Sequence, residues 1–183
     1  PIAMKDIPLI KQLMRAKSIA KFLHKKKLPS TSKNIQAIIT TLIKLRIQHD
    51  FPFWAACFVS IKTKEGGTTK FYLNYPQRLL VEQLENMRLA NQPIRMVILK
   101  ARQWGGSTLT AAYMFWMMRM HYKNWHTTIV ALDQSQAVNI RTMMKKMIKE
   151  LPEFHEPTSF KRHEGRETSR IIPETGAIVQ IGS

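Results

Sequence analysis

The sequence predicts an α/β fold in which a parallel sheet with helical crossovers follows a pair of basic helices. Two observations carry this prediction. Short apolar runs rich in β-formers alternate with helical repeats from about residue 94 to 151, and such alternation is typical of parallel strands joined by helices. The first fifty residues contain many lysines and arginines but only the acids Asp6 and Asp50. We therefore expect a basic helical region at 1–50 and an α/β region at 51–183.

The basic region is expected to form two helices. Apolar residues recur at helical spacing from 7 to 28 with lysines and arginines between them, and Pro29 ends the pattern. Ser30, Thr31 and Ser32 can cap a second helix at about 33–48.

The next segment changes period. Residues 56–62 and 68–73 are predicted strands of a hairpin around the turn at 65–67. Pro76 is suited to the first turn of a helix that ends near Leu89, because the missing N–H of proline costs nothing there.

The remaining elements follow in α/β order. We expect a strand at 94–99, a Gly-Gly turn, a helix at 107–122, a strand at 127–132 and a helix at 134–151 that Pro152 ends. Residues 168–172 and 177–181 are expected to form a second hairpin. The methionines of the two long helices have the spacing of residues that pack against a sheet.

Charge is the first indication of function. With 29 Lys and Arg against 12 Asp and Glu, the chain carries +17, which indicates a polyanionic partner such as double-stranded DNA. The alternative is a solvated helix face. A single cysteine, Cys57, excludes an internal disulfide, and no apolar run is long enough for a membrane span, so we expect no membrane partner and an intracellular location.

The most informative segment is the loop at 100–108, between a predicted strand and a predicted helix. In that context backbone N–H groups and the helix dipole favour a bound phosphate, and a hydroxyl at the helix start can bind Mg²⁺. Gly105 and Ser107 match the usual G-x-x-x-x-G-K-[ST] pattern, but Gly106 replaces its lysine. Lys100, five residues before Gly105, and Arg102 are the candidate replacement cations. An ordinary tight turn is the alternative.

These residues carry a resemblance. Lys-Ala-Arg-Gln-Trp-Gly-Gly-Ser-Thr at 100–108 resembles the phosphate loop of phage large terminases, several of which move the lysine to the front of the loop. The segment at 73–78 resembles the adenine motif of that family, with Gln77 in the place of its glutamine. Residues 49–54 and 128–137 are similar to further terminase segments, so the resemblance covers about 49–183.

The resemblance implies a RecA-like (ASCE) P-loop NTPase fold and an ATPase that drives DNA into capsids in an infected host cell. Gln77 would then contact adenine, Arg102 would act near the γ-phosphate, and Ser107 would bind Mg²⁺. The full set implied to bind ATP is Gln77, Lys100, Ala101, Arg102, Gln103, Trp104, Gly105, Gly106, Ser107 and Thr108. Implied partners are double-stranded DNA, a portal, a small terminase and further copies in a ring.

Hydrolysis by this class also needs an aspartate followed by a glutamate at the end of a buried strand. Asp133 ends an apolar run, but Gln134 follows it, so Asp133 is an imperfect candidate and we expect it to be a helix cap or a loop residue. The resemblance places the acidic pair on a later strand. Because the chain starts at Pro1 and stops at Ser183 after a predicted strand, we expect a fragment that ends before the acidic pair and hydrolyses ATP negligibly.

Two other functions stay open. A helicase-like ATPase also combines an upstream glutamine with a phosphate loop, although it normally keeps the loop lysine. A basic DNA-binding module with a degenerate nucleotide site would explain Gly106 as decay. The six histidines show no metal-site spacing with cysteine, so zinc is disfavoured.

Overall fold

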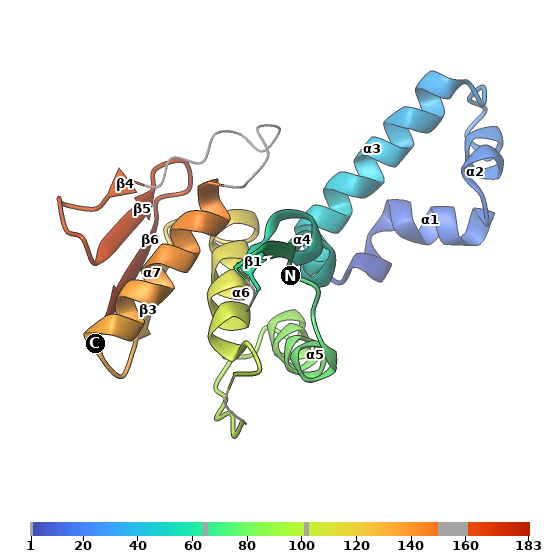
Figure 1. Cartoon of the computed structure of the whole chain (residues 1–183). Helices are drawn as coiled ribbons and strands as arrows, with labels where there is room; N and C mark the ends of the chain where they lie inside the picture. Colours follow the sequence, from blue (N-terminus) through green and yellow to red (C-terminus); the bar gives the residue numbers. More distant parts are fainter. Residues whose placement is uncertain (1, 64–65, 101–102, 150–160) are drawn as a thin grey trace. The chain divides into compact units, whose positions relative to one another are not determined.

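The computed structural model describes residues 2–63, 66–100, 103–149 and 161–183 (Figure 1). Within these ranges the chain is a mixed α/β protein with seven α-helices, a two-stranded sheet and a four-stranded sheet. It divides into two compact units, of which the first comprises Pro1–Phe53 and Leu79–Val97 and the second Trp54–Arg78 and Ile98–Ser183. Each unit is described by itself.

The first unit begins with a short 3₁₀ helix, η1 (Met4–Asp6), and three α-helices, α1 (Pro8–Ala16), α2 (Ile19–Lys25) and α3 (Ser32–His49). The single helix predicted over 7–28 is therefore wrong, because it is divided at Lys17. That residue adopts a left-handed conformation with φ of 61°, and its N–H donates to the carbonyls of Leu13 and Met14. Ser18 then caps α2 by accepting a hydrogen bond of 3.1 Å from the N–H of Lys21.

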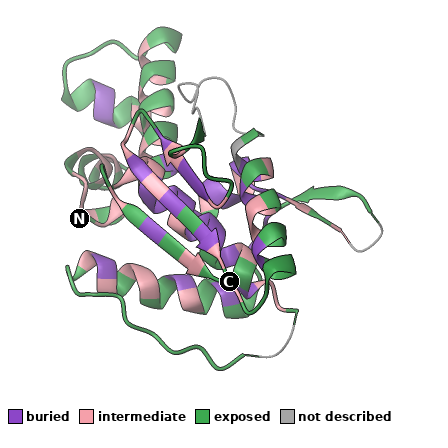
Figure 2. Cartoon of the chain, turned by 90° about the vertical axis from the view of Figure 1, so that its left-hand side faces the viewer, coloured by how far each residue is buried: buried purple, intermediate pink, exposed green. Residues whose placement is uncertain are grey.

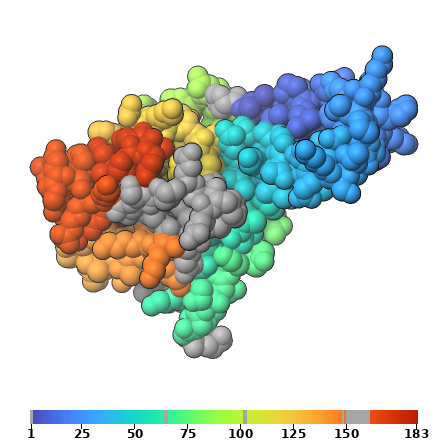
Figure 3. Space-filling view, turned by 90° about the horizontal axis from the view of Figure 1, so that it is seen from above, coloured from blue at the N-terminus to red at the C-terminus, as the bar shows by residue number. Residues whose placement is uncertain are grey.

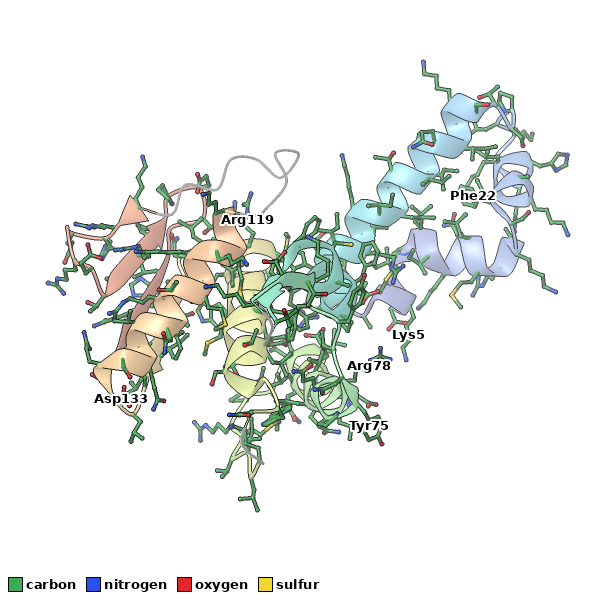
Figure 4. All side chains as sticks on the ribbon, in the orientation of Figure 1. Lys5, Phe22, Tyr75, Arg78, Arg119 and Asp133 are labelled. Atoms are coloured by element: carbon green, nitrogen blue, oxygen red, sulfur yellow. The ribbon has the colours of Figure 1, made fainter. Side chains whose placement is uncertain are left out.

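Of the described residues in helices α1, α2 and α3, three are buried, and all three are apolar. They are Phe22, which is labelled in Figure 4, and Leu23 of α2, and Ile47 of α3. The basic residues of the three helices are exposed, so the charge predicted for this region lies at the surface.

The first unit also contains a partly buried ion pair, Arg88–Glu85. Residues Leu79–Leu89 of helix α5 (Tyr75–Leu89) belong to it, and Arg88 is only 4% exposed. The guanidinium of Arg88 donates to both carboxylate oxygens of Glu85, at 2.8 Å from Nε and 2.6 Å from Nη2. Burial, and next the positive charge of Arg88, lower the pKa of His49 below its ordinary value.

The second unit begins within helix α4 (Phe51–Phe58). The strand predicted from residue 56 starts only at Ser60, because the preceding apolar run is helical. There Trp54 and Phe58 lie one turn apart with ring centroids separated by 6.1 Å, and Trp54 also contacts Phe115. Strands β1 (Ser60–Lys62) and β2 (Thr68–Lys70) then form the predicted antiparallel hairpin.

The core of this unit is helix α6 (Gly106–Met120), which is buried around most of its circumference (Figure 2). Helix α7 (Gln134–Lys149) packs beside α6 (Figure 1). It also lies against the four-stranded sheet (Figures 1 and 3). Six methionines of these helices were predicted to pack against the sheet. Met117, Met118, Met144 and Met147 are buried, whereas Met114 and Met143 are half-buried.

The four-stranded sheet has the order β3-β6-β5-β4. Its strands are β3 (His126–Val130), β4 (Lys161–Arg162), β5 (Ser169–Ile172) and β6 (Ala177–Gly182). Strands β3 and β6 are parallel, and the second predicted hairpin is confirmed as the antiparallel pair β5–β6. The sheet is therefore mixed, whereas the sequence predicted a parallel sheet with helical crossovers. Only the pair β3–β6 is parallel among the described strands.

The strand predicted at 94–99 is wrong. Residues Pro93–Lys100 have no regular secondary structure, and Val97 and Leu99 are fully exposed at 99% and 102% of their reference area. A run of β-formers becomes a strand only where a neighbouring strand supplies hydrogen-bond partners. No strand within the described residues pairs with this segment.

Candidate nucleotide-binding site

Gly105 stands immediately before the first residue of α6, at its N-terminal cap. Its φ of 83° is left-handed, and its carbonyl accepts the first helical hydrogen bond, from the N–H of Leu109 at 2.9 Å. A Cβ at this position would lie 2.7 Å from Nε2 of Gln77. Both the conformation and the close approach therefore require glycine, as the phosphate-loop pattern predicts.

Gln77, which is only 3% exposed, joins the loop to the start of α5. Its Nε2 donates to the carbonyl of Trp104 at 2.9 Å, and its Oε1 accepts from the N–H of Asn74 at 2.9 Å. In return the N–H of Gln77 donates to Oδ1 of Asn74 at 3.0 Å, which completes a reciprocal cap at the helix start.

These bonds bear on the adenine role predicted for Gln77. The side-chain acceptor and one of the two N–H groups of its carboxamide are occupied by the protein itself. What the geometry assigns to Gln77 is the positioning of Trp104 and Gly105, while adenine recognition stays a prediction.

Gly106 is the first residue of α6 and occupies the place of the usual loop lysine. A Cβ there would lie 3.1 Å from the indole ring of Trp104. The ring of Trp104 thus covers the space that a side chain at this position would need. Its Nε1 is buried and has no hydrogen-bond partner among the described residues.

Ser107 and Thr108 follow within the first turn of α6, where backbone N–H groups have no partner inside the helix. Ser107 is exposed and has the helix-start position predicted for a Mg²⁺ ligand. Lys100 is exposed in the irregular segment before the loop. Ala101 and Arg102, which the sequence predicts to bind ATP, lie outside the described residues, so the catalytic role predicted for Arg102 is untested.

A cavity of about 550 Å³ opens beside the loop within the second unit. Its volume is in the range of small-molecule sites. The loop contributes Gln103, Trp104, Gly105 and Thr108, the hairpin contributes Lys62, and α7 contributes Asn139 and Lys146 to its wall. The cavity therefore combines four of the predicted loop residues with side chains from two other elements.

The α7 side of this cavity was not predicted. Asn139, Thr142, Met143 and Lys146 recur at intervals of three and four residues and line the cavity together. Their helical period was visible in the sequence. The sequence did not show which element this face of α7 would contact, because the contact depends on how α7 packs against the hairpin.

Asp133 lies directly before α7 (Figure 4) and is a cap, as predicted. Its Oδ1 accepts hydrogen bonds from the hydroxyl of Ser135 at 2.6 Å and from the N–H of Gln136 at 2.9 Å. The bond from Ser135, followed by the bond from the N–H of Gln136, lowers the pKa of this carboxylate.

Across the described parts of the chain, no cluster of three or more His, Cys, Asp or Glu could hold a metal ion. No helix in those parts has the length and hydropathy needed to cross a membrane. Comparison with protein-family models and with curated proteins found no match to this chain.

Proposed function

We propose that this chain is the ATP-binding part of a viral DNA-packaging motor of the large-terminase type. The observation that carries the proposal is the left-handed Gly105 at the head of a long buried helix, beside a cavity of about 550 Å³. First-turn N–H groups of such a helix, together with its dipole, favour the phosphates of a nucleotide. Ser107 would bind the Mg²⁺ that accompanies ATP, and Lys100 and Arg102 are the loop cations implied by the terminase resemblance.

The basic first unit supports the DNA half of the proposal. Its exposed lysines and arginines suit sequence-independent contacts to phosphates of double-stranded DNA. In the motor, ATP hydrolysis would move that DNA into a capsid through a portal. A small terminase and other copies of the chain would be its further partners.

Calorimetric titration of the chain with MgATP tests the nucleotide half. We expect weak binding, negligible phosphate release, and at least about tenfold weaker binding for Gly105→Ala, because the new methyl group strains the backbone and displaces Gln77. The matched control is Gly165→Ala, which also replaces a glycine of positive φ but meets nothing within 4 Å. Absence of MgATP binding by the unaltered chain would overturn the proposal.

Lys100→Ala examines the front-of-loop lysine. A charge-assisted bond to phosphate contributes roughly 1.5 to 3 kcal/mol, so its loss should weaken MgATP binding about tenfold or more. Unchanged affinity in a folded variant would show that another cation serves the phosphates.

A further inference from the structure

The side chain of Trp104 lies over the first residue of α6. A Cβ built on Gly106 would lie 3.1 Å from Cε2 and from Cζ2 of Trp104 and 3.2 Å from its Nε1. These three atoms form the edge of the indole that carries the N–H group. The donor edge of the ring therefore lies against the start of the helix, at the position from which the usual loop lysine would extend.

This donor is buried without an acceptor. An indole N–H can only donate, and a buried one usually has a hydrogen-bond partner. Nε1 of Trp104 is buried and has no partner among the residues that the structure describes, although Trp104 as a whole is half-buried and lines the cavity. Burial of an unpaired donor costs free energy, and an acceptor that enters from the cavity would recover it.

The backbone that carries the ring is held in place on both sides. The carbonyl of Trp104 accepts a hydrogen bond of 2.9 Å from Nε2 of the buried Gln77, and Gly105 adopts φ of 83° at the helix cap. An acceptor beside this ring would also meet the first-turn N–H groups of α6, which have no partner inside the helix. Because these groups and the helix dipole favour negative charge, the acceptor expected here is an oxygen of an anion.

We propose that the indole N–H of Trp104 donates a hydrogen bond to a phosphate oxygen of the nucleotide bound at the start of α6. This inference rests on the function proposed above and deepens it, because it adds a neutral donor to the charges assigned there to Lys100 and Arg102. The ring turns toward the cavity on binding, which uncovers Nε1. Gly106 leaves room for the ring at the place where a lysine would stand.

Nuclear magnetic resonance of the whole chain labelled with ¹⁵N tests the bond directly. The chain has four tryptophans, and the indole N–H signal that is missing from Trp104→Phe belongs to Trp104. Magnesium triphosphate and MgATP should each move the proton of this signal downfield, because a hydrogen bond to a phosphate oxygen deshields it. Adenosine, which lacks phosphate, should leave the signal in place. If adenosine moves it and magnesium triphosphate does not, the ring contacts the base and the inference is wrong.

Calorimetry measures what the bond contributes to affinity. Trp104→Phe keeps an aromatic ring but removes the donor, so it should bind MgATP about tenfold more weakly. The matched control is Trp125→Phe, because Trp125 is also half-buried in the second unit but does not line the cavity. It should stay within about twofold of the unaltered chain. Unchanged positions of the three remaining indole signals in Trp104→Phe would show that its fold is intact.

Gly106→Ala tests the room that glycine leaves for the ring. The new Cβ would lie close enough to the indole to displace it by a few tenths of an ångström. Alanine favours a helix more than glycine does, so the fold should persist. MgATP binding should nevertheless weaken about threefold or more, since a hydrogen bond weakens when its geometry is disturbed. In Trp104→Phe the same substitution should have less effect, because the donor is already absent.

The two proposals can fail separately. If MgATP binds while the Trp104 signal stays in place and Trp104→Phe keeps full affinity, this inference is wrong and the proposed function stands. Tighter binding by Trp104→Phe would also overturn it, because the ring would then exclude the nucleotide. If the unaltered chain binds no MgATP, the proposed function fails and this inference fails with it.

Discussion

At the scale of single residues, Gln77 decides the geometry of the candidate site. It bonds Asn74 and Trp104 at once and leaves no room for a side chain at Gly105. Through these bonds the buried carboxamide of Gln77 connects the start of α5 to the loop that precedes α6. The residue that the terminase resemblance assigns to adenine thus has a positioning role of its own.

Gln77→Glu separates the two bonds. A carboxylate can still accept from the N–H of Asn74 but cannot donate to the carbonyl of Trp104, which would lose its bond and face a negative charge. We expect the free energy of unfolding to fall by about 1–3 kcal/mol, measured by urea denaturation at neutral pH. Gln83→Glu, an exposed change on the same helix, is the control. Equal stability of the two variants would contradict the positioning role of Gln77.

We expect His49 to make the stability of the first unit depend on pH. Burial and the charge of Arg88 lower its pKa below 6.5, so the folded state binds the proton less readily than the unfolded state. The contribution of neutral His49 to the free energy of unfolding is therefore fully present above about pH 6.5. It is lost as the pH falls from 6.5 through the lower pKa that His49 has in the folded protein. The free energy of unfolding should therefore decrease on acidification below that pH.

The substitution His49→Gln should flatten this part of the pH dependence, as followed by denaturant unfolding at a series of pH values. His24→Gln is the control, because His24 is exposed on α2 in the same unit. If both variants retain the slope of the unaltered chain, His49 is not its source.

At the scale of elements, the turn between α1 and α2 shows how a helical pattern can be divided without glycine or proline. The apolar spacing continues through the turn, yet Lys17 adopts φ of 61°, which ends α1, and Ser18 is the N-cap of α2. A left-handed conformation costs a non-glycine residue roughly 1 kcal/mol. The contacts between α1 and α2 offset this cost, and the spacing of apolar residues does not specify those contacts.

Lys17→Gly should therefore stabilise the first unit by about 0.5–1 kcal/mol, since glycine adopts this conformation without steric cost. Lys21→Gly, which removes the same charge from within α2, should destabilise it by about 1 kcal/mol. Thermal unfolding followed by circular dichroism measures both. Destabilisation by Lys17→Gly would mean that the side chain of Lys17, rather than its backbone, matters at the turn.

At the scale of the whole molecule, the distribution of charge along the chain leads to a prediction about DNA. The exposed basic residues of α1–α3 should give binding to duplex DNA with little sequence preference and a steep fall in affinity with salt. Removing residues 1–30 should weaken this binding most. A substitution that preserves the chain length gives a sharper test.

The substitution of Lys25, Lys26 and Lys27 by glutamine should lower affinity at fixed salt. It should also reduce the salt slope by about one for each DNA phosphate that the variant no longer neutralises. Replacing Lys70, Lys145 and Lys149 of the second unit in the same way changes net charge equally and should have less effect. Fluorescence anisotropy with a duplex of random sequence measures both. Equal reductions in affinity would place the DNA-binding surface outside the basic helices.

Much of the fold was determined by local sequence. Helix α3, helix α7 with its cap at Asp133, and both hairpins have apolar periods and turn residues that specify them without help from distant parts of the chain. The left-handed cap at Gly105 belongs with them, because glycine adopts that conformation without steric cost. The close approach of Gln77, which also excludes a side chain there, is a tertiary contact.

Only the tertiary structure decided the rest. The apolar runs at 54–58 and 94–99 have strand-like composition, but one is a helix and the other is irregular, since a strand depends on a partner that local sequence does not specify. The polar face of α7 can likewise be identified from the spacing of polar residues in its own sequence. That this face lies against the hairpin and places Lys146 beside Thr68 follows from packing between segments 78 residues apart, which no local pattern encodes.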